Sequence, residues 1–133
     1  MWTEKASAHR PELVQMFEVA FSIHVTLLGE KGLRAMAQVN HANACAAAER
    51  LSRVPGVELV TPRFFNEFTL RLPRETRPIV RALAERGILA GVSLGRLYPD
   101  GDGRENGLVV AVTETVTPED VEAYASALEE VLA

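Results

Sequence analysis

Apolar residues in the first part of the chain recur every three or four positions, which is the spacing of an α-helical face. The first such stretch runs from about Arg10 to Leu28 and is apolar on nearly every side, so this helix should be largely covered. Pro11 suits a first helical turn, and Gly29 suits a left-handed C-terminal cap. A second helix is predicted over Glu30 to Val54, where small residues along one seam would let another backbone approach closely.

After Pro55 the apolar residues alternate with polar ones, which is the side-chain pattern of β-strands. Two strands are predicted, one over Val57 to Leu59 and one over Phe68 to Leu72. A helix is then predicted over Thr76 to Arg86, and Gly87 ends it as the cap residue.

Short strands are expected in the last third of the chain. One is predicted near Ile88 to Val92, and a continuous apolar run over Leu108 to Val112 suits an interior strand. The segment from Pro99 to Gly107 between them is rich in turn-forming residues and is predicted to be a loop.

The last helix has a clear start signal. The Thr117 hydroxyl can accept a hydrogen bond from the backbone of Asp120, and Pro118 occupies the first helical position. Five side chains of this helix are expected to face inward: Val121, Tyr124, Ala125, Leu128 and Val131. The resulting order of elements predicts one domain over residues 1–133, with an α+β fold in which a small, mainly antiparallel sheet is covered by helices in two layers.

Composition narrows the possible functions. The 133 residues carry a net charge of −4 and have a pI near 5.4, without the basic stripe that would neutralise phosphates, which argues against nucleic acid as a partner. The longest apolar region, Val14 to Leu28, is interrupted by polar residues, and no cleavable signal precedes it. We therefore expect neither export nor a membrane span, and a cytoplasmic location.

Metal or thiol chemistry has little support in the sequence. His9, His24 and His41 are widely spaced and show no metal-ligand pattern. Cys45 is the only cysteine, which excludes a disulfide within the chain. Because alanines flank it, we expect a buried, inert thiol that belongs to the core.

Four polar residues are candidate contacts for a carboxylate or for an interface: Asn66, Glu67, Arg96 and Tyr98. Arg96 could bind a carboxylate through two parallel hydrogen bonds, and Tyr98 could add a third. In the alternative interpretation Arg96 pairs with an acidic neighbour and Tyr98 packs beneath the following loop. Asn66 and Glu67 could likewise only satisfy backbone groups at a strand end. No catalytic, cofactor-binding or metal-binding residue is predicted.

Several short motifs carry a resemblance to one family. The motif Phe65-Asn66-Glu67-Phe68 is the most specific, and Leu27-Leu28-Gly29-Glu30-Lys31-Gly32-Leu33 and Pro55-Gly56-Val57-Glu58 keep the same register. Together they resemble the C-terminal part of the alpha subunit (subunit 1) of two-subunit glycine decarboxylase, the pyridoxal-phosphate (PLP) P-protein of the glycine cleavage system. The resemblance starts at Glu4-Lys5-Ala6-Ser7, but Ala8 to Val14 replace the polar motif that follows in the family.

The resemblance implies the small C-terminal domain of a fold-type-I PLP enzyme, without the large cofactor-binding domain. In that family the Schiff-base lysine belongs to the second (beta) subunit. This chain has only Lys5 and Lys31, neither beside a glycine-rich phosphate cradle, so we expect no cofactor on this chain alone and PLP only in the full enzyme.

The implied role is assembly of the P-protein, as a homodimer or with the PLP-carrying beta subunit. The whole enzyme, as the resemblance implies, decarboxylates glycine and passes the aminomethyl group to the lipoyl arm of H-protein, which would be an indirect partner. Two alternatives stay open: a free-standing regulatory or small-carboxylate-binding module, and a remnant of the subunit that folds without a present role.

Overall fold

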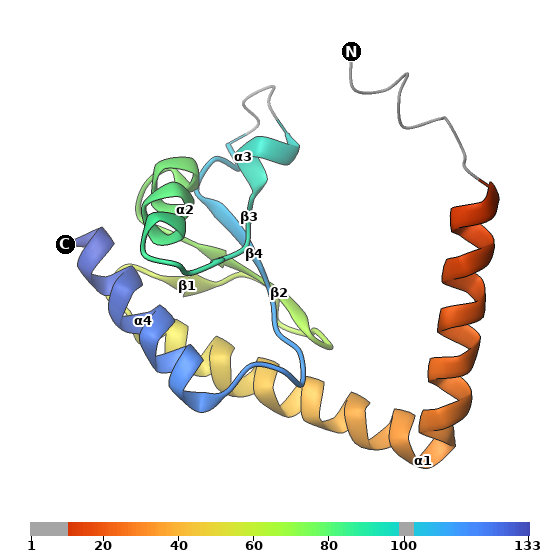
Figure 1. Ribbon diagram of the computed structural model, residues 1–133. Helices are drawn as coiled ribbons and strands as arrows, with labels where there is room; N and C mark the ends of the chain where they lie inside the picture. Colours follow the sequence, from red (N-terminus) through yellow and green to blue (C-terminus); the bar gives the residue numbers. More distant parts are fainter. Residues whose placement is uncertain (1–10, 99–102) are drawn as a thin grey trace. The chain divides into compact units, whose positions relative to one another are not determined.

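The computed structural model describes residues 11–98 and 103–133 (Figure 1). Its elements, in chain order, are α1 (Pro11–Leu51), β1 (Glu58–Leu59), β2 (Glu67–Arg71), α2 (Thr76–Glu85), β3 (Val92–Ser93), α3 (Leu94–Leu97), β4 (Gly107–Ala111) and α4 (Pro118–Leu132). The chain divides into two compact units, one up to Met36 and one from Ala37 onwards. The expectation of a single domain over residues 1–133 remains a prediction.

The first unit is the N-terminal part of α1. Gly29 interrupts the helix with φ 60° and ψ −178°, a left-handed φ that favours glycine, so the predicted boundary between two helices is present as a kink. Arg34 donates to Glu30 one turn earlier, just after the kink. No described side chain between Val14 and Met36 is buried.

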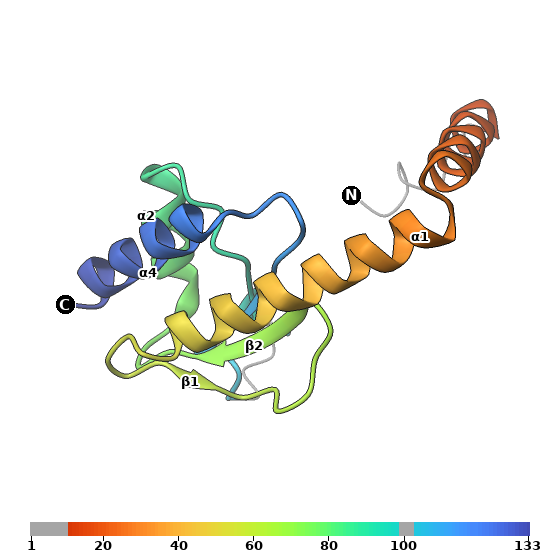
Figure 2. The same cartoon turned by 90° about the horizontal axis from the view of Figure 1, so that it is seen from below.

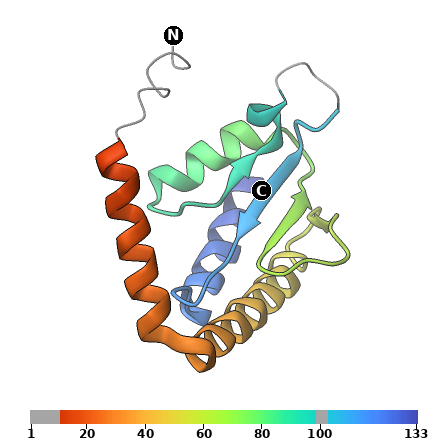
Figure 3. The ribbon, with the colours of Figure 1, turned by 90° about the vertical axis from the view of Figure 1, so that its right-hand side faces the viewer.

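The second unit contains an antiparallel sheet with the strand order β1-β2-β4-β3. Phe68 lies opposite Val110, and Leu70 lies opposite Leu108; all four side chains are buried on one face. The other face carries exposed or half-buried residues such as Thr69. The second half of α1 and α4 run side by side against the sheet (Figures 2 and 3). The predicted two-layer α+β fold is confirmed.

Small residues bring α1 close to the sheet. Ala44, Ala47 and Ala48 are at most 2% exposed and share the core with Leu51. The same cluster includes residues of the sheet, of α2 and of α4: Phe68, Leu70, Leu72, Ile79, Leu83, Leu108, Val110, Ala125 and Leu128. The three half-buried residues Val121, Tyr124 and Val131 pack against it, so the predicted inner face of α4 is confirmed.

The start of α4 is also as predicted. The Thr117 hydroxyl accepts from the Asp120 backbone N–H, and the Asp120 carboxylate accepts from the Thr117 N–H at 2.9 Å, which completes a capping box. These hydrogen bonds, first from the backbone and then from the hydroxyl, hold the pKa of Asp120 below its ordinary value. Pro118 begins the helix.

Some predicted boundaries are wrong. Helix α1 ends at Leu51, three residues before the expected Val54. The strand expected over Ile88 to Val92 is β3, Val92–Ser93, because Ile88 N–H donates back to Leu83 and the Ala90 carbonyl accepts from the Tyr124 hydroxyl at 2.9 Å instead of joining a ladder. The short helix α3 was not predicted.

We predict that Gly91→Ala destabilises the fold far more than Gly87→Ala. Gly91 has φ 136°, and a Cβ there would collide with the backbone carbonyl of Val109 in the neighbouring strand. Gly87 has φ 80° with open space around it, so its substitution carries backbone strain alone. Urea unfolding should give a loss of about 3 kcal/mol or more for Gly91→Ala and about 1 kcal/mol for Gly87→Ala. Equal losses would contradict the close approach at Gly91.

Candidate functional site

The most unusual surface in the structure is the apolar N-terminal part of α1. Seven large apolar side chains between Val14 and Leu27 are exposed: Val14, Met16, Phe17, Val19, Phe21, Ile23 and Leu27. Phe17 and Phe21 are each 68% exposed, although they are among the largest apolar residues of the chain. We call these seven residues the apolar helix segment. Exposed apolar side chains gathered on one segment are typical of a surface that another part of the same protein or a partner covers.

The sequence predicted that this helix is covered, and within its own unit it is not. Ser22 and Thr26 return their hydroxyls to the helix carbonyls of Glu18 and Ser22, so these polar side chains are satisfied locally. None of the helices in the described ranges is long and apolar enough to cross a membrane.

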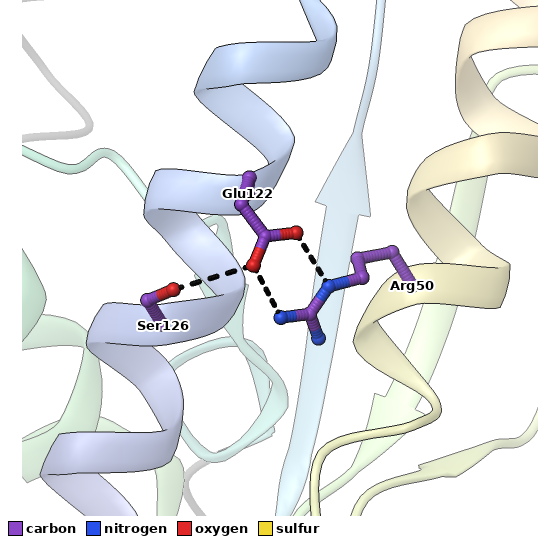
Figure 4. Close-up of polar contacts among 3 residues, drawn as sticks. All are labelled: Arg50, Glu122 and Ser126. Atoms are coloured by element: carbon purple, nitrogen blue, oxygen red, sulfur yellow. Dashed lines mark hydrogen bonds and ion pairs between the residues drawn. The ribbon is translucent and has the colours of Figure 1, made fainter.

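In the second unit, one ion pair joins α1 to α4. Arg50 donates through Nε and Nη2 to the two carboxylate oxygens of Glu122, each at 2.7 Å, and Ser126 donates weakly to the same carboxylate at 3.5 Å (Figure 4). This two-pronged hydrogen bonding to Arg50 holds the pKa of Glu122 below its ordinary value of 4.5. The pair links α1 to α4 at a partly exposed position.

The side chain of Asn43 supports the same contact. Its amide N–H groups donate to the carbonyls of Thr113 and Val116 at 3.1 Å each. Asn43 therefore ties α1 to the segment between β4 and α4. Neither this contact nor the Arg50 pair was predicted, because the partners lie about seventy residues apart in sequence.

Cys45 is exposed, which overturns the prediction of a buried core thiol. It follows Ala44 on α1 but lies outside the buried alanine seam, and its Sγ is 3.7 Å from Nε2 of His41 one turn earlier. His41 Nδ1 is hydrogen-bonded to the Phe65 carbonyl at 2.8 Å, and its ring stacks on Phe65. The four-residue spacing on a predicted helix could have placed His41 beside Cys45, whereas the contact between His41 and Phe65 is made only by the fold.

The four candidate contact residues do not form one site. Asn66 is half-buried and Glu67 is exposed at the start of β2, where the Asn66 carbonyl accepts from Val112 N–H at 2.9 Å. Arg96 is exposed on α3 and borders a groove beside α2. Tyr98 does not line that groove; its ring lies under the Arg104 guanidinium, 4.6 Å from ring centroid to Cζ. A carboxylate clamp of Arg96 and Tyr98 remains a prediction.

The remaining candidate residues are two lysines and two histidines. Lys31 and His24 are exposed on α1, whereas Lys5 and His9 lie outside the described residues. No group of three or more histidine, cysteine, aspartate or glutamate side chains that could hold a metal is found in residues 11–98 and 103–133.

Two buried hydroxyls were also missed by sequence reasoning. Thr76 Oγ1 lies 2.7 Å from Ser93 Oγ, 2.8 Å from the Glu105 carbonyl and 3.1 Å from the Gly107 carbonyl. A hydroxyl donates only one proton, so the Thr76 hydroxyl cannot donate in all three contacts. The Ser93 hydroxyl supplies the proton between the two side chains, and the Thr76 hydroxyl donates to a carbonyl. These contacts tie the start of α2 to both β3 and β4, which is a structural role.

The chain is closely similar to one group of relatives. It is 63% identical over 126 residues to the probable glycine dehydrogenase (decarboxylating) subunit 1 of Rhizorhabdus wittichii, which covers 95% of this chain and 28% of the relative. It is 58% identical over 130 residues to the corresponding protein of Sphingopyxis alaskensis, covering 98% and 29%. The chain thus spans less than a third of the length of these relatives. No family model matches it.

The comparison with solved structures finds the same similarity. A crystal structure of glycine decarboxylase (P-protein) of the glycine cleavage system, in inhibitor-bound form, has a TM-score of 0.75 at 40% identity, covering 83% of this chain and 24% of that one. A NifS-like protein has a TM-score of 0.62 at 18% identity over 77% of this chain, which shows the fold alone. The predicted likeness to the small domain of fold-type-I PLP enzymes is confirmed.

We predict that Glu122→Gln destabilises the chain at neutral pH and has little effect in strong acid. Since the pKa of Glu122 is lowered in the folded state, the pair stabilises the fold above the ordinary carboxyl pKa, and this stabilisation is lost as pH falls through the lowered value. Urea unfolding across acidic and neutral pH measures the difference. Ser126→Ala keeps the Arg50 pair and should keep the wild-type pH profile. A pH-independent loss for Glu122→Gln would contradict this role.

We also predict that Cys45 reacts with a thiol reagent such as dithionitrobenzoate in the folded chain about as readily as in the urea-unfolded chain. The side chain is exposed, so no unfolding is needed for access. Cys45→Ser gives the blank, because no other cysteine is present. If Cys45 reacted only when the chain unfolds, the thiol would be buried, as the sequence predicted.

Proposed function

We propose, from its close similarity to part of subunit 1 of glycine dehydrogenase (decarboxylating), that this chain acts as the small C-terminal lobe of that subunit and serves assembly of the glycine cleavage P-protein. It has no complete active site of its own. The observation that supports an assembly role is the apolar helix segment, whose exposed phenylalanines need a partner surface.

The described residues do not fit a covalent PLP site. A Schiff-base lysine needs a desolvated pocket and an oriented cofactor, whereas Lys31 is exposed on a helix that buries none of its described side chains before Ala37. No step of the reaction is therefore assigned to this chain. PLP would be held by the beta subunit, and the chain would support glycine decarboxylation indirectly.

The proposed partner is the PLP-carrying beta subunit, with H-protein meeting the assembled enzyme and not this lobe alone. A second copy of the chain is the alternative occupant of the apolar helix segment. We propose the cytoplasm as the location, in accord with a single free cysteine.

We predict that Phe17→Ser combined with Phe21→Ser weakens association with the beta subunit. Burying one phenylalanine contributes about 1.5–3 kcal/mol, so each substitution should weaken binding about tenfold or more. Analytical ultracentrifugation of the chain alone and with separately purified beta subunit measures this. Leu89→Ser is the matched control, since Leu89 is 94% exposed but lies outside the segment.

The possible outcomes separate the candidates. A complex with the beta subunit that Leu89→Ser keeps and the double variant loses supports the proposal. Self-association lost in the double variant assigns the segment to a homodimer instead. A monomer that does not bind the beta subunit contradicts an assembly role.

A further inference from the structure

A groove between α2 and the β3–α3 segment carries three arginines. Arg77 and Arg81 lie one turn apart on α2, and Arg96 lies on α3 across the groove. The groove encloses about 460 Å³, and no aspartate or glutamate is among its lining residues. This is unusual in a chain whose net charge is −4. The elements that form it, α2, α3 and β3, lie next to one another in Figure 1.

The three guanidinium groups differ in how they are held. Arg77 donates through Nη2 to the Gly95 carbonyl at 2.7 Å, which fixes its position between the two walls and leaves further N–H groups for a ligand. Arg81 makes only an exposed pair with Glu85 at 3.3 Å, a contact of little strength. Arg96 makes no ion pair or hydrogen bond with the residues that the structure describes.

The rest of the groove is apolar or neutral. Val80 and Ala84 come from α2, and Val92 comes from the edge strand. An apolar floor with cations on both walls suits a ligand that has an organic body and anionic groups at more than one position. A single exposed guanidinium pair contributes little, so one anionic group would bind weakly and two or more are needed.

We propose that this groove is a binding site for a small anion with at least two acidic groups, either carboxylates or phosphates. Arg81 and Arg96 supply the main charge contacts from opposite walls, and Arg77 adds further hydrogen bonds from its fixed position. The site shares no residue with the apolar helix segment, goes beyond the proposed assembly role, and does not include Tyr98.

The test is a titration followed by backbone NMR at constant ionic strength, with acetate, citrate and inorganic pyrophosphate as the three probes. Citrate or pyrophosphate should shift signals of α2 and β3 at millimolar concentration, and acetate should not. Tighter binding of citrate would indicate a preference for carboxylates, and tighter binding of pyrophosphate a preference for phosphates. Arg81→Gln and Arg96→Gln should each weaken binding about fivefold, the equivalent of about 1 kcal/mol per contact.

Two further variants make the test specific. Glu85→Gln removes the partner of Arg81 and should strengthen binding. Arg53→Gln is the matched control, because Arg53 makes the same kind of exposed pair one turn from Glu49 but lies outside the groove. The proposal is overturned if neither polyanion shifts these signals, or if Arg53→Gln weakens binding as much as Arg81→Gln.

Discussion

The second unit depends on one apolar contact, in which the buried face of the sheet meets the alanine seam of α1. Ala44, Ala47 and Ala48 provide the surface of α1 that packs in this core, and their small side chains fill it without large groups. The contact buries Phe68 and Leu70 completely or nearly so, and each fully buried side chain of this size contributes about 1.5–3 kcal/mol. The Arg50–Glu122 pair then sets how α4 lies against the same helix.

Elements defined by local periodicity were predictable from sequence. The helices α1, α2 and α4 and the strands β2 and β4 follow apolar spacing and cap residues that lie within each segment. Strand β3 was displaced because its pairing depends on Val109 of a strand that comes later in the chain. Helix α3 has only four residues, which is too short for any period to show.

The polar contacts were less predictable, and Cys45 shows why. Its alanine neighbours suggested a buried environment, but successive side chains of a helix are about 100° apart, so burial of one residue does not extend to the next. Ala44, Ala47 and Leu51 share the inner face, and the position after Ala44 points away from it. The helical seam could have excluded Cys45 from the core, and the four-residue spacing could have placed His41 beside it. The hydrogen bond from His41 to Phe65 required the fold.

The edge strands of the sheet affect how other proteins can bind the chain. β1 and β3, the two edges, are only two residues long, so each offers few unpaired backbone groups to an incoming strand. Short edges of this kind protect against strand addition and edge-to-edge aggregation. A partner that met the proposed lobe would therefore contact mainly side chains, so its recognition would depend on shape and charge and not on generic backbone pairing.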